Sequence, residues 1–430
     1  MRILHLLSQI PSATGSGIYL QAAMRHAARR GHQNLLLAGV PMDFGAGRHS
    51  DQLACEGCHF VRFGDSDAQK NWPSLPHSVV GMSDVMPYPS SRFCDLTPQQ
   101  VDQYEACFTD HLCKAVEKWQ PELIHSHHLW LLTSLAGQLF PELPLVVSCH
   151  GTDLRQFRSC PQLQQRALRG SRHINRVYAL HPQQIPEIET LYGIESTRID
   201  LVGSGYNEHL FYPYPTTRPQ QTIQLVYAGK LSRAKGLPWL LKALLENDDP
   251  QWQLHLAGDG QGKEKEEILQ LAAQRPNQIR LHGLISQKQL ANLLRSSHLC
   301  LLPSFYEGLP LILLEALACG CRLLTTELPG AQQLFADIRH DWIEHVPLPP
   351  MQGIDVPTPE GEGIFIRSLK QGIQRQFQSI RRPADTDSMH MPDSVARILH
   401  QYSWEATVAR MEQGYEHAWQ EQRAQKQGRN

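Results

Sequence analysis

PSFYEGLPLILLEALACG, from Pro303 to Gly320, is the stretch from which the fold of this chain can be worked out. The apolar run 299–302 before it is typical of a buried strand, and the following turn brings Glu307 to the start of a strongly apolar helix. Pro310 suits the first turn of that helix, because the first amides of a helix have no partner within it. A strand that passes through a short turn into a helix indicates an α/β fold.

Glu315 is the only carboxylate of the predicted helix and lies among leucine and alanine, so it needs a partner. If the helix begins near Leu309, Glu307 and Glu315 are up to about 12 Å apart at roughly 1.5 Å per residue. Free amides at a helix start bind an anion, and a carboxylate on each side can accept hydrogen bonds from hydroxyl groups. A nucleotide sugar has this chemistry. The alternative is that Glu307 is a surface turn acid and Glu315 a buried, hydrogen-bonded helix residue.

The pattern P-S-x-x-E-G-L-P-L-x-L-L-E-A-L-A-x-G resembles the retaining family 4 glycosyltransferases of the GT-B fold. In that family the first glutamate faces the donor sugar and the second binds the ribose hydroxyls. The resemblance therefore implies these roles for Glu307 and Glu315, with the amides of Gly308 and Leu309 at the donor.

The length of 430 residues predicts two domains of about 200 residues each. Hydrophobic residues make up 41% and charged residues 19%, and the net charge is −2, so the composition gives no indication of nucleic-acid binding. No apolar stretch is long enough to span a membrane, and MRILHLL is too short for a signal peptide. We expect a cytoplasmic protein, peripheral at the inner face of the membrane. The ten scattered cysteines predict free thiols, and one CxxC, Cys55 to Cys58, is weak support for zinc.

The N-terminal part begins with a strand at 3–7, a glycine-rich turn and a helix at 18–30. Glycine lets backbone amides approach a ligand, but the residues alone favour an ordinary strand-to-helix turn. By its resemblance to the glycine loop of the family, Gly17 is the predicted donor contact. Residues 42–98 are rich in Gly, Pro, Ser and Asp, and predict an insertion that binds the acceptor or is a plain surface loop.

Two further strands end in histidine-containing segments, His125-Ser-His127-His128 and Cys149-His150-Gly-Thr-Asp153. Ligands bind at the carboxyl ends of the strands in open α/β sheets. Strand alternation places the side chains of His125 and His127 on one face and His128 on the other, with no acidic or cysteine partner close in sequence, so no metal site is predicted. The HGTD segment resembles a family motif and implies that His150 approaches the donor sugar and the acceptor.

The Pro-rich segment 211–222 predicts a linker, after which strand 223–228 leads into GKLSRAKG. Cations between a strand and a helix can bind a diphosphate, although a solvated loop has the same composition. The family pattern G-R-L-x-x-x-K-G matches Lys235, whereas Lys230 replaces the usual arginine and Arg233 is expected to contribute instead. In relatives the segment that contains Leu284 passes the nucleotide base. A terminal helix from about 401 resembles the helix that crosses back to the first domain.

The predicted fold is therefore α/β of the GT-B type, with two doubly wound Rossmann-like domains facing across a cleft. The acceptor-side domain covers 1–210, the nucleotide-sugar domain 223–400, and the helix 401–430 packs back on the first. We expect a hexosyltransferase-type enzyme of polysaccharide biosynthesis. It would transfer a sugar, with retention and without a cofactor or metal, from a nucleoside diphosphate sugar to a carbohydrate or lipid-linked acceptor. The alternatives are a sugar-nucleotide-binding or assembly protein without activity, and a GT-B phosphorylase.

Overall fold

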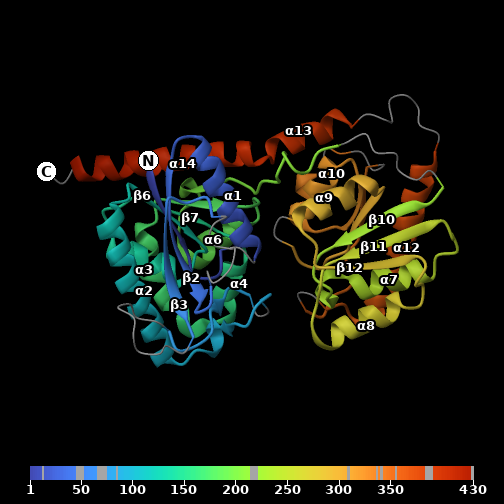
Figure 1. Cartoon of the computed structure of the whole chain (residues 1–430), viewed down its shortest axis with the longest axis horizontal. Coiled ribbons are helices and arrows are strands. Elements are labelled where there is room, and N and C mark those ends of the chain that lie inside the picture. The colour runs from blue at the N-terminus through green and yellow to red at the C-terminus, as the bar shows by residue number, and fades with distance from the viewer. Residues whose placement is uncertain are drawn as a thin grey trace. The chain divides into compact units, whose positions relative to one another are not determined.

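A computed structural model of the whole chain describes most of its residues (Figure 1). The description leaves out 12–13, 45–52, 65–74, 84–85, 214–220, 308–309, 336–337, 339–341, 354–355, 383–390 and 428–430. The described residues form two compact units. Unit 1 contains Met1–Ser204 and Trp404–Asn430, and unit 2 contains Gly205–Ser403.

Unit 1 is built on a sheet of seven parallel strands in the order β3-β2-β1-β6-β7-β8-β9. The strands of this sheet are β1 (Arg2–Leu7), β2 (Gln33–Pro41), β3 (Gly57–Phe63), β6 (Leu123–His127), β7 (Leu145–Ser148), β8 (Arg176–Ala179) and β9 (Ile199–Leu201). A separate pair is formed by β4 (Val80–Gly81) and β5 (Ser91–Arg92). The main strands are mostly apolar because helices cover both faces of a parallel sheet.

The helices of unit 1 connect these strands and bury their apolar sides against the sheet. They are α1 (Gly15–Arg29), α2 (Pro98–Trp119), α3 (Leu131–Leu139), α4 (Thr152–Ser159), α5 (Gln164–Leu168), α6 (Gln184–Tyr192) and α14 (Trp404–Gln427). The predicted start of α2 is confirmed, since Thr97 and Gln100 form a reciprocal capping box and Pro98 is the first helical residue.

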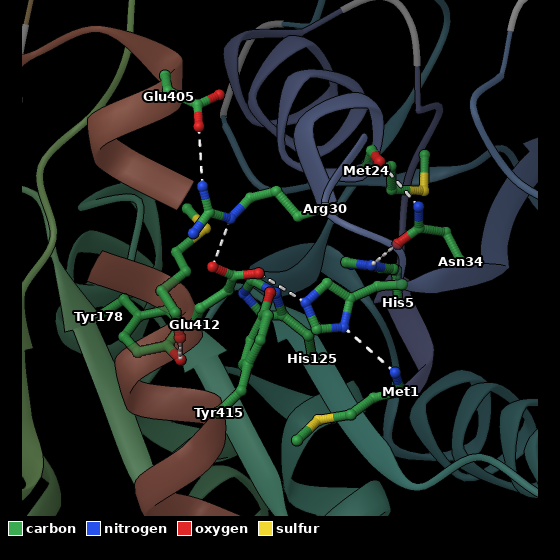
Figure 2. Close-up of polar contacts among 12 residues, drawn as sticks. Met1, His5, Met24, Arg30, Asn34, His125, Tyr178, Glu405, Glu412 and Tyr415 are labelled. Atoms are coloured by element: carbon green, nitrogen blue, oxygen red, sulfur yellow. Dashed lines mark hydrogen bonds and ion pairs between the residues drawn. The ribbon is translucent and has the colours of Figure 1, made fainter. Parts of the chain in front are cut away.

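Helix α14 belongs to unit 1, although unit 2 separates it from the rest of that unit in the sequence. Its buried apolar residues recur every three or four positions and form one stripe, Trp404, Val408, Met411, Tyr415 and Ala418. Polar contacts fix the helix on both sides of this stripe (Figure 2). Arg30 pairs with Glu405 at 2.8 Å and with Glu412, and Tyr178 donates a hydrogen bond to the carbonyl of Met411 at 2.7 Å.

Unit 2 contains six parallel strands in the order β12-β11-β10-β13-β14-β15. They are β10 (Ile223–Ala228), β11 (Trp252–Ala257), β12 (Ile279–Gly283), β13 (Leu299–Leu302), β14 (Arg322–Thr326) and β15 (Ile343–Val346). The helices are α7 (Leu237–Leu245), α8 (Gly262–Ala272), α9 (Gln287–Ser296), α10 (Leu311–Ala318), α11 (Pro329–Leu334), α12 (Pro359–Arg381) and α13 (Asp393–Gln401). Two units with parallel sheets confirm the predicted α/β class.

Three local predictions need correction. Helix α10 begins at Leu311, so Pro310 is its extended N-cap residue and not part of its first turn. The predicted insertion 42–98 contains β3, a strand of the main sheet, paired in parallel with β2.

The prediction of ten free thiols is also wrong, because Cys94 is joined to Cys160 and Cys55 to Cys58. Cys94 and Cys160 are 66 residues apart in the sequence, and only the folded chain brings them together.

In the part of the chain that the structure describes, no helix is both long and apolar enough to cross a bilayer.

Candidate functional site

The side chains of Lys235 and Glu307 meet in unit 2. The ammonium of Lys235 lies 2.6 Å from Oε1 of Glu307, and the hydroxyl of Ser304 donates to the same oxygen at 2.7 Å. The pair is partly buried, with 27% of the lysine and 15% of the glutamate side chain exposed. Both contacts are made to Oε1, so among the residues that the structure describes Oε2 of Glu307 is left to accept hydrogen bonds from hydroxyl groups.

The backbone around Gly236 sets the position of Lys235. Lys235 ends a short 3-10 helix, Arg233–Lys235, and Gly236 follows with a φ of 68°. A Cβ at Gly236 would collide with the carbonyl of Pro303 at the end of β13. Glycine therefore allows the lysine loop to lie directly against the strand that leads to Glu307.

Arg233 lies in the same loop, but its guanidinium already has other partners. It pairs with Glu267 at 2.8 Å and with Glu362 at 3.4 Å, and it stacks on the ring of Trp239 at 4.8 Å. These two ion pairs use two of its five N–H donors, and its charge is compensated by the two carboxylates. Lys230 is exposed, and its ammonium makes no ion pair with any residue that the structure describes.

Glu315 is buried in α10, with 8% of its surface exposed. Burial raises the pKa of its carboxyl group from 4.5 to about 8, so the acid holds its proton at neutral pH in the absence of a ligand. Leu284, which follows β12, is 81% exposed. Gly308 and Leu309 lie outside the described residues, so their predicted roles stay predictions.

The predicted residues of unit 1 lie at the carboxyl ends of its strands. Asp153 is fully buried, and its Oδ2 accepts hydrogen bonds from the backbone amides of Leu129 at 2.8 Å and His150 at 3.2 Å. The carboxylate thereby fixes the loops that follow β6 and β7 relative to each other. Burial lowers the pKa of His150 to about 3, so its imidazole is neutral at physiological pH.

Aromatic rings hold His150 in place. Tyr19 of α1 contacts its ring edge-on at 4.9 Å, and Trp404 of α14 packs against Tyr19 at 5.0 Å. Nε2 of His150 lies 3.4 Å from Nδ1 of His127. Gly17 lies two residues before Tyr19, and a Cβ there would lie 2.8 Å from the backbone of Pro11. The close turn before α1 therefore requires glycine, whether or not Gly17 contacts a ligand.

Comparison with known proteins identifies the family to which this chain belongs. Residues 14–205 match the model of the glycosyl transferase 4-like domain, and residues 213–347 match that of glycosyl transferases group 1. The chain belongs to the group 1 glycosyltransferase family. This confirms the family resemblance that rested on the two glutamates of the 303–320 stretch.

The curated relatives of this glycosyltransferase are distant. D-inositol 3-phosphate glycosyltransferase of Pseudarthrobacter chlorophenolicus is 28% identical over 52% of this chain and 61% of its own length. Mannosylfructose-phosphate synthase of Agrobacterium fabrum is 25% identical over 39% of this chain and 41% of its own length. The chain thus spans 61% and 41% of the length of these two relatives.

Solved structures match this glycosyltransferase over nearly its whole length and confirm the GT-B fold. Sucrose-phosphate synthase from Thermosynechococcus elongatus has a TM-score of 0.65 at 19% identity, with 97% of this chain and 98% of that chain covered. Anabaena HepE in complex with UDP and glucose has a TM-score of 0.63 at 14% identity, with 97% and 99% covered.

Several residues near the predicted ones were missed by sequence reasoning. Ser304 is part of the quoted stretch and could have been chosen as a hydroxyl three residues before Glu307. Tyr19 and Trp404 carry no signal of their own, because only the packing of α14 on α1 brings them together. The ion-pair partners of Arg233 come from α8 and α12, and the sequence alone could not predict them either.

Proposed function

We propose that this glycosyltransferase transfers a sugar from a nucleoside diphosphate sugar to a hydroxylated acceptor with retention of the anomeric configuration. The observation that supports this best is the contact between Lys235 and Glu307. It places a cation beside a carboxylate that keeps one oxygen available for a sugar hydroxyl. A donor with a diphosphate next to a sugar offers one partner to each of the two groups.

In the proposed reaction the bond between the anomeric carbon and the diphosphate oxygen breaks, and a bond to the acceptor oxygen forms on the same face. The acceptor proton moves to the departing diphosphate oxygen, so no side chain acts as nucleophile or base. Negative charge builds on the leaving group, and Lys235 stabilises it together with Lys230. Arg233 contributes less, because Glu267 and Glu362 already compensate its charge.

Donor binding changes the surroundings of Lys235. Before binding, its charge is compensated by Glu307, and the diphosphate offers a second anionic partner. As the bond to the diphosphate breaks, negative charge builds on the diphosphate. The contact between Lys235 and the diphosphate is therefore stronger in the transition state than in the ground state. We assign Glu315 to the ribose hydroxyls, and we assign His150, as a neutral imidazole, to a hydroxyl of the donor sugar or acceptor.

The remaining assignments are part of the same proposal. The acceptor is a carbohydrate or lipid-linked glycan precursor, no metal takes part in transfer, and the protein acts in the cytoplasm at the inner face of the membrane. Disulfides are rare in that reducing compartment. A thiol count on protein alkylated during cell lysis therefore tests the location. In the cell the cysteines of the Cys55–Cys58 and Cys94–Cys160 bridges should be reduced if the location is right, and intact bridges would contradict it.

The deciding experiment is nucleotide release from UDP-, GDP- and ADP-sugars in the presence of candidate acceptors, with the product anomer assigned by NMR. Retained configuration and release that depends on the acceptor support the proposal. Binding without release indicates a binding or assembly protein, and dependence on inorganic phosphate indicates a phosphorylase. Lys114→Ala is a matched control for lysine loss, because Lys114 pairs with Asp110 at 2.7 Å on α2 of unit 1.

A further inference from the structure

Three histidines lie together in the centre of the unit 1 sheet. His125 and His127 are two residues apart on β6 and face the same side, and His5 on β1 is directly opposite His125 in the strand register. The rings of His125 and His127 stack at 4.5 Å, and the ring of His5 is 5.3 Å from His125 and 5.8 Å from His127. One ring nitrogen from each histidine lies within 4.8 Å of the other two.

The hydrogen bonds of His5 leave one nitrogen with its lone pair unused (Figure 2). The amide nitrogen of Asn34 donates to the carbonyl of Met24 at 2.7 Å, so the amide oxygen of Asn34 faces Nε2 of His5 at 3.1 Å. That oxygen can only accept, so Nε2 of His5 carries the hydrogen. Nδ1 of His5 then has a free lone pair, and it is buried without a hydrogen-bond partner among the described residues.

His127 has the same arrangement with its nitrogens exchanged. Its Nδ1 faces His150, whereas its Nε2 is buried and has no hydrogen-bond partner in the described part of the chain. His125 contacts hydroxyl groups at both nitrogens, with Tyr415 at Nδ1 and Ser148 at Nε2, each at 2.8 Å. The Ser148 hydroxyl can turn away by a change of side-chain rotamer, which releases Nε2 of His125 without breaking an ion pair. The Tyr415 oxygen is held by its ring and can accept from Nδ1.

We propose that His5, His125 and His127 bind one divalent transition-metal ion of the zinc type. Ring nitrogens of neutral histidine are the preferred protein ligands of such ions together with thiolates, and three histidines form a known ligand set. Metal-bound histidines usually donate their second ring N–H to an oxygen or another polar group, and Asn34 serves His5 in this way. Burial lowers the pKa of all three imidazoles, so their lone pairs are not protonated at neutral pH.

The location gives the ion a structural role. The three side chains are 0–1% exposed, and they join the adjacent strands β1 and β6 beneath α14. Three histidines leave the fourth position of a tetrahedral ion to a small ligand such as water, and burial keeps a substrate from reaching it. The ion therefore takes no part in the transfer reaction, although one of its proposed ligands, His127, contacts His150, which we assign to a sugar hydroxyl.

The test uses the full-length protein without a histidine tag, unfolded and refolded in the presence of a chelator and then with Co²⁺ or Zn²⁺. Refolding with metal gives the ion access to a site that is closed in the native state. We expect one Co²⁺ per chain with visible absorption bands, and a thermal midpoint that rises with added Zn²⁺. His5→Gln and His127→Gln should weaken Co²⁺ binding by at least about tenfold and abolish the thermal shift.

His417→Gln is the matched control, because His417 lies exposed on α14 close to Tyr415 and should leave binding unchanged. Two outcomes would overturn the proposal: wild-type protein that refolds without taking up Co²⁺, or glutamine variants that bind as tightly as wild type. If one glutamine variant does not fold, the other and the wild-type stoichiometry still decide the question.

Discussion

The buried carboxyl group of Glu315 gives unit 2 a predictable dependence on pH. Its pKa is about 8 in the folded protein and 4.5 in the unfolded chain, since burial penalises the charged form. Between these two values the unfolded chain has released the proton and the folded protein still holds it. The stability contributed by this group therefore falls as the pH rises through that window, and it is constant above pH 8.

The size of the effect follows from the difference between the two pKa values. From pH 5.5 to pH 8, the fall is about 2.5 pH units at about 1.36 kcal/mol each, or roughly 3 kcal/mol. Glu315→Gln has no proton to lose and keeps a similar shape. Its stability relative to wild type should rise by the same amount over this range.

Urea unfolding at pH 5.5 and pH 8.5 measures the difference. With a slope of about 2 kcal/mol per molar urea, the midpoint of the affected transition should shift by about 1 to 2 M between wild type and Glu315→Gln. Glu266→Gln, an exposed position on α8, controls for the loss of one charge. Parallel pH curves for wild type and Glu315→Gln would refute the reasoning. A saturating nucleotide should flatten the wild-type curve, because ribose hydroxyls stabilise the carboxylate.

Four further outcomes test the assigned roles. Glu315→Ala should weaken nucleoside diphosphate binding by roughly 10- to 100-fold, since charge-assisted hydrogen bonds worth about 1.5–3 kcal/mol are lost; unchanged affinity for UDP, GDP and ADP by titration calorimetry would contradict the ribose role. Lys235→Ala should lower kcat more than it raises the donor KM, as steady-state kinetics will show, and a change in KM alone would reduce Lys235 to ground-state binding. His150→Ala should reduce turnover per folded molecule much more than His127→Ala, and equal losses would argue against a direct role for His150. Initial-rate assays should show that transfer survives EDTA, even where removal of a buried ion lowers the thermal midpoint of unfolding. Activity that is lost with EDTA and restored by the ion would indicate metal-assisted chemistry.

The sequence predicted correctly those features that depend on interactions between residues close together in the chain. The capping box at Thr97 satisfies helix amides within a few residues, so it can be recognised without the fold. The placement of His125 and His127 on one face of a strand follows from the alternation of side chains alone. The motif around Glu307 is dense enough to predict the family and the two-unit fold.

Contacts between distant segments could not be predicted in this way. His5 joins the histidines of β6 only through the register of two parallel strands that are separated by more than a hundred residues. From the sequence, His125 was compared only with residues close to it along the chain, whereas His5, the third histidine of the proposed metal site, lies on the neighbouring strand. Arg233 was assigned to the diphosphate because of its loop, whereas the carboxylates that hold it come from α8 and α12.

The position of α14 in the sequence affects how the protein is made. Unit 1 needs Trp404–Gln427, and the ribosome reaches this segment only after it has translated all of 205–403. At about 5–20 residues per second this takes roughly 10 to 40 s. During that time Tyr415 is not available to His125, and the surface that α14 later covers is open to water. Unit 1 therefore stays incomplete until unit 2 and then α14 have been translated. We expect chaperones to bind it mainly during this interval, while the surface that α14 covers is exposed.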